Sequence, residues 1–220
     1  MSSGNVRIHP TALIEEGVSL GAGTSVWDNV HIRRNTVIGE NGIVGEKTYI
    51  AYDVKIGNGV KIHSYVYICT GVTIEDGVMI AAGTIFTNDQ YPRAFEPGDF
   101  SVKTSEPTEE TLETVVRRGV TIGAGCIIGP GVELGEFSMI GMGSVVTRDV
   151  KPFELVYGNP ARPVGHVCLC GQPLAPGRRK AAARKSPSAK APQLLSCPAC
   201  LRRYARSKSG VALKRGSALR

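Results

Sequence analysis

The sequence predicts an all-β fold, a parallel β-helix built from hexapeptides, and three observations lead to this prediction. A bulky apolar residue recurs at every sixth position over most of the first 146 residues. A small or β-branched residue usually stands two positions before it, and Gly or Asn usually stands three positions after it. A period of six matches neither the 3.6 residues of a helical turn nor the alternation of one long strand.

The apolar positions form a single register of anchors, which breaks after residue 86 and resumes at residue 116. The anchors are Ile8, Ile14, Leu20, Val26, Ile32, Ile38, Val44, Ile50, Ile56, Ile62, Ile68, Ile74, Ile80, Phe86, Val116, Ile122, Ile128, Leu134, Ile140 and Val146. All twenty are bulky and apolar, which predicts that they share one core.

The residues around each anchor predict a short strand followed by a corner. Residues i and i−2 of a strand lie on one face, so Thr24, Val54 and Cys126 should point inward with the anchors that follow them. Gly and Asn tolerate positive φ, so Gly17 and Asn29, three positions after their anchors, predict sharp corners. Strand and corner repeated in this way are typical of a hexapeptide β-helix.

The pattern IG-x-G/N-x-x-I resembles the hexapeptide-repeat acyltransferases over residues 5 to about 166. The resemblance implies a left-handed parallel β-helix with three hexapeptides in each triangular coil, and therefore six to seven coils for twenty anchors. It also implies a homotrimer with active sites in the clefts between subunits. The inside of such a column is filled with side chains, so function is expected on its outer surface.

Composition divides the chain into residues 1–166, with a loop insertion at 87–115, and a basic, Cys-rich tail at 167–220. From Ala161 onward there are 14 of the 26 Lys and Arg and no Asp or Glu, which leaves 12 basic against 19 acidic groups before it. The formal charge of +7 therefore hides an acidic body. A basic tail could bind nucleic acid or an acidic membrane surface. With Tyr204 as its only aromatic residue, however, it offers no platform for stacking bases.

No N-terminal apolar segment and no long apolar run is visible, so we expect a cytoplasmic protein without a membrane span. Thiols stay reduced in the cytoplasm, so paired cysteines there indicate a metal-binding site more often than a disulfide bond. CLC and CPAC supply Cys168, Cys170, Cys197 and Cys200, which could give a structural zinc site with four thiolates, a small zinc knuckle. The alternative is four free thiols in a disordered end. The stretch APGRRKAAARKSPSAKAP between them is predicted to be a flexible linker.

The insertion begins FTNDQYPRAFEPGDF and is too long for a corner. Loops longer than about 15 residues in a compact domain are usually functional or disordered, so it is either a wall of the neighbouring subunit's active site or a disordered insertion. FTNDQYPRA, VWDNVHI and YGNPARPVGHVCLCG resemble segments of bacterial N-acetyltransferases that act on the 3-amino group of nucleotide-linked sugars. These are enzymes for UDP-2-acetamido-3-amino-2,3-dideoxyglucuronate and for dTDP-3-amino-3,6-dideoxyhexoses.

The resemblance implies that acetyl-CoA is the donor, that a nucleotide sugar is the acceptor, and that the product enters cell-surface polysaccharide or a glycosylated metabolite. Asn88 would lie beside the amine or thioester, and Arg93 would support the loop or the substrate. A neutral amine already attacks a thioester, so the enzyme gains most by holding the two together. An Asn amide can also stabilise developing charge by a hydrogen bond.

With three faces per coil, Leu13, His31, Tyr49, Tyr67 and Ile85 should stand in one outward row that leads to Asn88. Tyr49 and Tyr67 are candidate substrate contacts, or plain subunit contacts. His31 and His63 are candidate general bases, or simply exposed polar residues. His31 and Asn88 should lie three coils apart, roughly 14 Å at the strand spacing, too far to touch one reacting atom in one subunit.

Coenzyme A carries phosphates, which call for basic side chains and backbone N–H groups. By resemblance, Gly123 and Gly141 line the edge along which pantetheine runs, and Arg148, Lys151 and Arg162 are candidates for the phosphates. The alternative is that these glycines serve corners and the basic residues face solvent.

Three other functions remain open. An O-acetyltransferase of a sugar or another small hydroxylated acceptor would depend on His31 or His63 as base. A γ-type carbonic anhydrase would hold a metal on three histidines between subunits. Before Ala161 the chain has only His9, His31 and His63, without the paired spacing expected there. A non-catalytic scaffold or nucleic-acid-binding module is the last.

Overall fold

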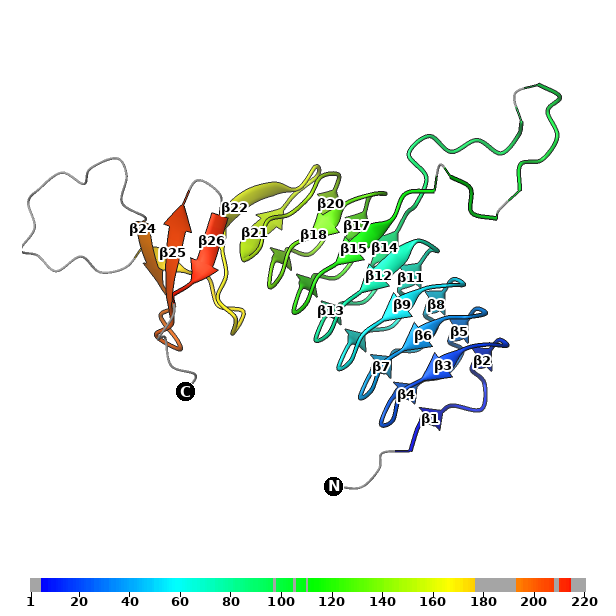
Figure 1. Ribbon diagram of the computed structural model, residues 1–220, viewed down its shortest axis with the longest axis horizontal. Helices are drawn as coiled ribbons and strands as arrows, with labels where there is room; N and C mark the ends of the chain where they lie inside the picture. The colour runs from blue at the N-terminus through cyan, green and yellow to red at the C-terminus, as the bar shows by residue number, and fades with distance from the viewer. Residues whose placement is uncertain are drawn as a thin grey trace, which may run out of the picture.

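The computed structural model describes residues 5–96, 98–104, 106–109, 111–176, 193–207 and 210–214. Over these ranges the chain contains strands and no α-helix, and most strands stack into a column with three faces (Figure 1). The predicted all-β fold, a parallel β-helix of hexapeptides, is therefore confirmed. None of the described residues belongs to a helix long and apolar enough to span a membrane.

Each face of the column is one sheet made from every third strand. The first face contains β1 (Arg7–Ile8), β4 (Ser25–Val26), β7 (Ile43–Val44), β10 (Lys61–Ile62), β13 (Met79–Ile80), β16 (Thr121–Ile122), β19 (Met139–Ile140), β21 (Glu154–Tyr157) and β22 (Arg162–His166). The second contains β2 (Leu13–Ile14), β5 (His31–Ile32), β8 (Tyr49–Ile50), β11 (Tyr67–Ile68), β14 (Ile85–Phe86), β17 (Ile127–Ile128) and β20 (Val145–Val146). The third contains β3 (Ser19–Leu20), β6 (Val37–Ile38), β9 (Lys55–Ile56), β12 (Val72–Ile74), β15 (Thr114–Val116) and β18 (Glu133–Leu134).

Within the regular repeat, neighbouring strands on a face are parallel and 18 residues apart, as in the pairing of Lys61 with Met79. Three hexapeptides therefore make one turn, as expected. The predicted number of six to seven coils is too low, because the first face carries β21 as an eighth parallel strand. After Val146 the spacing shortens: Val150 bridges to Leu134 and Val156 pairs with Ile140, so the column continues beyond the last anchor of the repeat.

The anchors fill the inside of the column. Seventeen of them, from Val26 onward, are at most 4% exposed, and the small or β-branched residues two positions earlier, such as Thr24 and Val54, are buried with them. The first turn is different, because Ile8 is 47% exposed and Ile14 and Leu20 are only partly buried. The core is therefore continuous but open at its N-terminal end over the described residues.

The predicted corners adopt positive φ. Besides the Gly and Asn corners, Lys47, Asp53, Tyr65 and Phe137 take φ values between 55° and 61° at the same position. L-residues other than Gly and Asn rarely adopt this conformation, so the stacked turns impose it on them. The corner geometry thus belongs to the repeat and not to the residue type alone.

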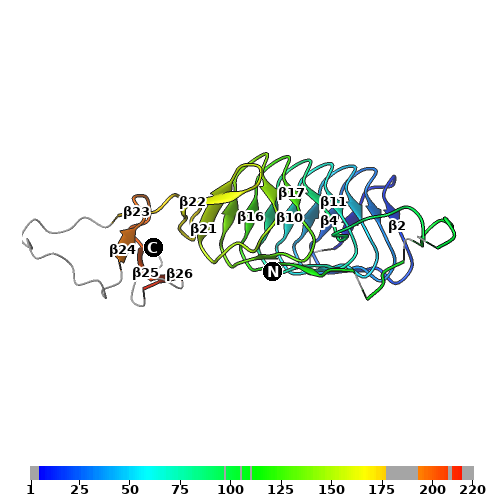
Figure 2. The same ribbon diagram turned by 90° about the horizontal axis from the view of Figure 1, so that it is seen from above.

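Two segments depart from the column. The chain leaves after β14 and returns at β15, and this excursion projects away from the turns (Figures 1 and 2). Beyond β22 a small antiparallel sheet, ordered β23 (Ala175–Pro176), β24 (Gln193–Ser196), β25 (Arg203–Ser207) and β26 (Gly210–Leu213), forms a C-terminal module. The predicted flexible linker, apart from residues 175–176, lies outside the described residues.

Candidate functional site

Asn88 lies at the root of the excursion, directly after β14 on the second face. Its backbone carbonyl accepts a hydrogen bond from the N–H of Leu112 at 3.2 Å, which brings the two ends of the excursion together. Its side-chain Nδ2 donates to the carbonyl oxygen of Thr70, one turn below, at 3.4 Å. An amide nitrogen has two protons, so one can hold the corner while the other is offered to a ligand.

The excursion is organised by its own contacts. Phe95 and Val102 form an antiparallel bridge, and the Phe95 and Phe100 rings stack with centroids 4.5 Å apart. Yet Tyr91 is 86% exposed, Phe100 73% and Val102 89%. Apolar side chains displayed together in this way are typical of an interaction surface.

The excursion also contacts the N-terminal half of the column. The Arg34 guanidinium donates to the Glu106 carboxylate at 3.1 Å and lies over the Tyr52 ring, 4.4 Å from its centroid. Arg93, predicted to support the loop or substrate, is exposed, and its guanidinium donates to the carbonyl of the adjacent Pro92 at 3.3 Å.

The predicted outward row on the second face is present. His31 pairs with Tyr49 and Tyr49 with Tyr67 in the strand register, and Tyr67 pairs with Ile85. The His31 ring meets Tyr49 edge-on at 5.4 Å, and the Tyr49 and Tyr67 rings stack at 5.3 Å. The row leads up to the strand before Asn88, with His31 three pairings below it, as predicted.

His31 is part of a charged group at the second turn that the sequence did not predict. The Glu15 carboxylate accepts hydrogen bonds from His31 Nε2 at 2.8 Å and from the Arg34 N–H at 2.9 Å, and it forms an ion pair with the Arg33 guanidinium. Burial alone would raise the pKa of Glu15, but the donors from Arg33, Arg34 and His31 outweigh it and lower that pKa to about 2. Arg33 also donates to the Tyr49 hydroxyl at 2.9 Å.

His63 lies on a different part of the column, the edge between the first and second faces. The residues that follow successive first-face strands stack there: Gly45, His63, Ala81, Gly123 and Gly141. His63 therefore lies in line with the two predicted donor-site glycines and not with His31. We call the upper part of this edge, residues 81–83, 123–125 and 141–143, the smooth edge, because all of these residues except Met142 are Gly or Ala.

Two glycines of the smooth edge, Gly123 and Gly141, are required by packing between turns. A Cβ on Gly123 would lie 2.5 Å from the Met142 backbone nitrogen, and one on Gly141 would lie 2.8 Å from the Tyr157 Cβ. No side chain fits at either position, whatever binds there.

The three predicted phosphate ligands lie on different edges of the last turn. Arg162 pairs with Tyr157, which covers Gly141, so it stands at the end of the smooth edge. Arg148 follows β20 on the edge between the second and third faces, and Lys151 lies above Gly135 on the remaining edge. All three are exposed, and within one chain only Arg162 adjoins the smooth edge.

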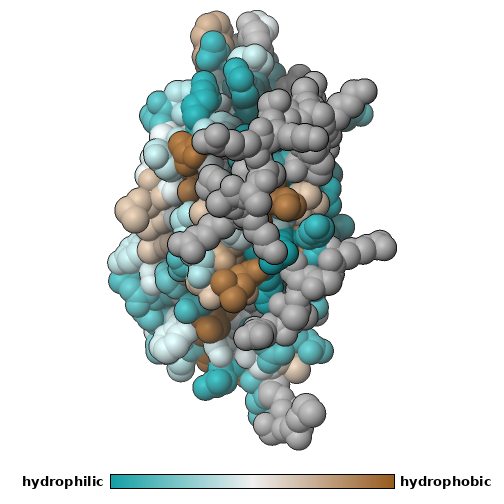
Figure 3. Space-filling view, turned by 90° about the vertical axis from the view of Figure 1, so that its left-hand side faces the viewer, coloured by the Kyte–Doolittle hydropathy of each residue, from teal (hydrophilic) through white to brown (hydrophobic). Residues whose placement is uncertain are grey.

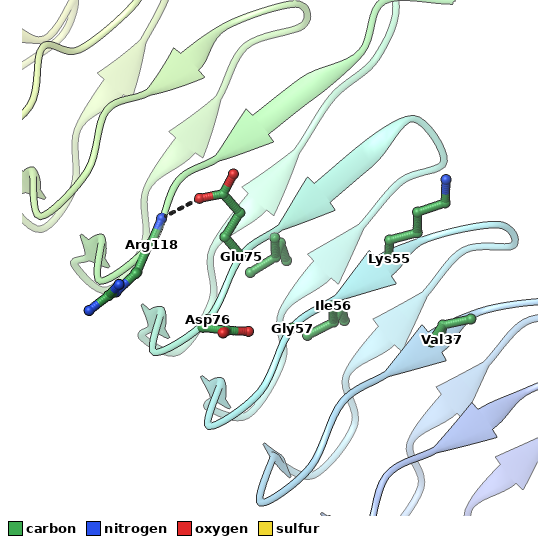
Figure 4. Close-up of a pocket in the computed structure, with 8 residues that line it drawn as sticks. Val37, Lys55, Ile56, Gly57, Glu75, Asp76 and Arg118 are labelled. Carbon is green, nitrogen blue, oxygen red and sulfur yellow. Dashed lines mark hydrogen bonds between the residues drawn. The ribbon is translucent and has the colours of Figure 1, made fainter.

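A hollow of about 490 Å³ lies on the third face, away from all of these residues. Val37, Ile56 and Ile74 contribute apolar surface, and Lys55, Asp76 and Arg118 contribute charge. Figure 4 shows Glu75 accepting a hydrogen bond from the Arg118 N–H, at 2.9 Å. The sequence did not point to this hollow, since its lining residues show no pattern beyond that of the hexapeptide repeat. It does not coincide with the Asn88 excursion, on which the chemistry was predicted.

The four tail cysteines come together in the C-terminal module, with all four Sγ atoms within 4.8 Å of one another. Among the described residues they are the only group of three or more His, Cys, Asp or Glu that could hold a metal ion. His9, His31 and His63 do not form such a group within the described chain.

Comparison with known proteins identifies the repeat in part of this chain. Residues 53–88 and 113–148 match the family described as bacterial transferase hexapeptide (six repeats). These matched residues therefore carry the hexapeptide repeat that the sequence pattern indicated.

Named relatives share shorter segments with it. It is 51% identical over 61 residues to dTDP-3-amino-3,6-dideoxy-alpha-D-galactopyranose 3-N-acetyltransferase of Aneurinibacillus thermoaerophilus. The aligned segment covers 28% of this chain and 32% of the relative. It is 42% identical over 52 residues to a chloramphenicol acetyltransferase of Agrobacterium fabrum, 24% of this chain and 25% of the relative. The chain thus spans a third or less of the length of these curated relatives.

Solved structures with a related fold overlap more of the chain at lower identity. AntD, an N-acyltransferase from Bacillus cereus in complex with dTDP and 3-hydroxybutyryl-CoA, is 20% identical, with a TM-score of 0.45, over 74% of this chain and 80% of that one. PerB from Caulobacter crescentus, in complex with CoA and GDP-perosamine, is 22% identical, with a TM-score of 0.42, over 74% and 58%. Both TM-scores are below 0.5, a likeness too low to transfer a ligand or a residue role.

Proposed function

We propose that this protein is an acetyl-CoA-dependent N-acetyltransferase that acetylates the 3-amino group of a UDP- or dTDP-linked amino sugar. The observation that carries the proposal is the excursion rooted at Asn88, which displays Tyr91 and Phe100 to solvent and begins with the segment FTNDQYPRA. The 51% identity to a nucleotide-sugar 3-N-acetyltransferase over 61 residues supports it.

In the proposed reaction, the neutral amine attacks the thioester carbonyl, the C–N bond forms, and a tetrahedral oxyanion develops. Asn88 Nδ2 donates its second proton to this oxyanion while its first holds the Thr70 carbonyl. Collapse of the intermediate breaks the C–S bond and releases coenzyme A, and the amine proton leaves to water or to the thiolate. Holding both substrates in place supplies the rest of the rate enhancement.

The acceptor would lie along the second face, where Tyr67 and Tyr49 offer stacked rings for a sugar or base. The donor would lie along the smooth edge, where Gly125 and Gly143 have open space at the position of a Cβ and leave room for a narrow chain beside Gly123 and Gly141. Arg162, at the end of that edge, is the best-placed phosphate ligand within one chain. In a homotrimer Arg148 and Lys151 would be available to a donor bound against the neighbouring subunit.

The decisive experiment measures thiol release from acetyl-CoA by the purified full chain with a panel of UDP- and dTDP-3-amino sugars. We expect an N-acetylated product by mass spectrometry, and a 10²–10³-fold lower kcat for Asn88→Ala, about the cost of removing one oxyanion donor. Thr104→Ala, an exposed residue of the same excursion, is the control and should keep full activity. Absence of turnover with every 3-amino sugar would refute the proposal.

The donor site has its own test. Arg148→Ala, Lys151→Ala and Arg162→Ala are each assayed with acetyl-CoA and with acetyl-dephospho-CoA, which lacks the 3′-phosphate. We expect Arg162→Ala to raise KM roughly 10- to 150-fold with acetyl-CoA, the loss of one charge-assisted hydrogen bond of roughly 1.5–3 kcal/mol. If Arg162 binds the 3′-phosphate, the increase in KM disappears with acetyl-dephospho-CoA. A penalty equal for both donors would assign Arg162 to the diphosphate, which both donors carry, and no penalty with either donor would remove it from the phosphate site.

A second candidate function is O-acetylation of a small hydroxylated acceptor, and one specific contact favours it. Glu15 orients the imidazole of His31 through Nε2, an arrangement suited to a general base, which a hydroxyl needs and an amine does not. His31→Ala separates the two functions. A loss of at least 10²-fold together with an ester product would support O-acetylation, and near-normal amide formation would exclude it.

A further inference from the structure

The C-terminal module is held together around its cysteines. Cys168 and Cys170 lie in the turn after β22, and Cys197 and Cys200 lie in the turn between β24 and β25. Each turn is closed by a backbone bond, from the Gly171 N–H to the Cys168 carbonyl at 2.8 Å and from the Leu201 N–H to the Cys197 carbonyl at 3.1 Å. Two tight turns, far apart in sequence, therefore point their sulfurs at one another.

The spacing of the sulfurs suits one tetrahedral ion. Four thiolates about 2.3 Å from a zinc ion lie about 3.8 Å from each other. Here Cys168 Sγ and Cys200 Sγ are 3.3 Å apart, Cys170 Sγ and Cys197 Sγ are 3.5 Å apart, and all four lie within 4.8 Å. Movements of about half an ångström or less per sulfur would place all four at the bonding distance.

The groups around the sulfurs are hydrogen-bond donors. The Tyr204 hydroxyl accepts from the Leu169 N–H at 3.0 Å, so its own proton is directed at Cys168 Sγ, 3.1 Å away. The Cys200 N–H donates to Cys197 Sγ at 3.4 Å, and the Arg202 guanidinium donates to Cys200 Sγ at 3.3 Å. Donors of this kind stabilise metal-bound thiolates, and Arg202 offsets part of the net charge of −2 that four thiolates and Zn²⁺ would carry.

The same tyrosine connects this cluster to the end of the β-helix. The Tyr204 ring is fully buried and meets the Phe153 ring at 5.4 Å, and Phe153 stacks on Phe137 at 5.5 Å. The Val167 N–H donates to the Phe153 carbonyl at 2.9 Å, directly before the first cysteine. Phe153 is 8% exposed, so the module covers the last turn.

The two ends of the column differ in the exposure of their apolar residues, as expected if the C-terminal end is capped and the N-terminal end is open. At the C-terminal end Val146, Val150 and Val156 are all at most 4% exposed, whereas Ile8 in the first turn is 47% exposed. The antiparallel β22 also ends the parallel ladder of the first face. Figure 3 looks onto this end of the molecule, where hydrophobic residues lie scattered among hydrophilic ones. An uncapped β-helix end offers unpaired strand edges and apolar surface for aggregation.

We propose that Cys168, Cys170, Cys197 and Cys200 bind one structural zinc ion, and that this zinc holds the C-terminal module as a cap on the β-helix. Binding releases the thiol protons to solvent as four Zn–S bonds form. Four thiolates complete the tetrahedral shell, which leaves no position for a substrate or water. Because the module is small, the free energy of zinc binding is largely the free energy of folding it.

Metal content is the first test. The full chain, expressed with zinc and purified without chelator, should contain one zinc per chain by elemental mass spectrometry. Cys197→Ser should lose it, and Cys69→Ala, a buried cysteine of the body, should keep it. A chain isolated without zinc that does not take it up, or one whose four tail cysteines form two disulfides, would overturn the proposal.

Tyr204→Phe tests the site without emptying the core, since it keeps the ring against Phe153 and removes the donor to Cys168. We expect zinc affinity, measured by competition with a chromogenic chelator, to fall 10–100-fold, as is usual for loss of an outer partner of a ligand. Tyr91→Phe, on the exposed excursion, should leave it unchanged. Equal affinities for the wild type and Tyr204→Phe would overturn the assignment of Tyr204 as a positioning residue.

Hydrogen exchange tests the cap itself. Chelation of zinc from the full chain should increase exchange at residues 153–156 and 203–206 and leave the middle turns, such as residues 61–68, unchanged. Exchange at residues 153–156 that does not respond to chelation would overturn the cap. Neither readout depends on catalysis, so this proposal and the acetyltransferase proposal can fail separately.

Discussion

Glu15 shows at the scale of a single residue how the column couples charge to folding. It belongs to the first turn, whereas its partners His31, Arg33 and Arg34 belong to the second, so the ionised carboxylate joins two turns that the backbone ladder also joins. The open N-terminal end has little apolar burial, since Ile8 is half exposed and Ile14 is only partly buried. Polar contacts therefore matter more here than in the middle of the column.

This predicts a pH dependence of stability. The pKa of Glu15 is about 2 in the folded chain against an ordinary value of 4.5, so the folded state favours the ionised carboxylate. That stabilisation is fully present above pH 4.5 and is lost as the pH falls from 4.5 through 2. We expect the free energy of unfolding, from urea titrations at pH 5 and pH 3, to fall more for the wild type than for Glu15→Gln.

Glu106→Gln is the control for that experiment, because Glu106 pairs with Arg34 from an exposed position on the excursion. Its pH dependence should match that of the wild type. A Glu15→Gln variant that loses as much stability as the wild type between the two pH values would show that the pairing with Arg33 and His31 does not contribute to folding.

At the scale of the element, the hexapeptide uses glycine for two different reasons. Gly59 has a φ of +61° and open space where a Cβ would stand, so only its backbone conformation calls for glycine. Gly123 does not have positive φ, but a Cβ there would meet the Met142 nitrogen at 2.5 Å. One glycine serves the corner, and the other serves the close approach of successive turns.

The two cases should differ in measured stability. Gly59→Ala should cost about 1–2 kcal/mol, the penalty of an L-residue in the left-handed region. Gly123→Ala should cost more, at or above the roughly 1–3 kcal/mol of an overpacked core, because backbone atoms must move apart. Chemical denaturation of both variants checks this. A cost for Gly123→Ala no larger than that for Gly59→Ala would mean that the turns at the smooth edge relax easily.

For the whole molecule, the distribution of exposed apolar residues is uneven. Along the second face Leu13, Tyr67, Ile85 and Ile127 are each between 40% and 56% exposed, in one row that continues past the root of the excursion. Extended apolar rows on a monomer are typical of surfaces covered by a partner. We expect this face, together with the exposed Tyr91 and Phe100 of the excursion, to be covered in the proposed homotrimer.

Sedimentation velocity tests the assembly. The wild type should sediment as a trimer of the 23.4 kDa chain. Ile127→Lys should weaken the assembly, because it places a charge within the covered row. Val37→Lys, which is 46% exposed on the third face, is the matched control and should still assemble. Dissociation by Val37→Lys alone would place the interface on the third face, and a monomeric wild type would refute the homotrimer.

The sequence by itself determined the β-helix, because a six-residue period of anchors can be buried in few other ways. It also determined the corners, although Lys47 and Tyr65 took the same positive φ without being Gly or Asn. Together with the three hexapeptides per turn that the family resemblance implied, it predicted the row His31, Tyr49 and Tyr67, because residues 18 apart must then stack.

Only the tertiary structure decided which side chains share an edge and what lies at the ends of the column. Three of these features have no periodic signal in the sequence. They are the pairing of Glu15 with His31, the separation of Arg148, Lys151 and Arg162 onto three edges, and the burial of Tyr204 against Phe153. Each joins residues at separations that the repeat does not set, or beyond residue 146, where the hexapeptide spacing ends. Periodicity records which residues enter the common core, whereas contacts on the surface and at the ends depend on side-chain reach and on how the non-repeating segments fold back.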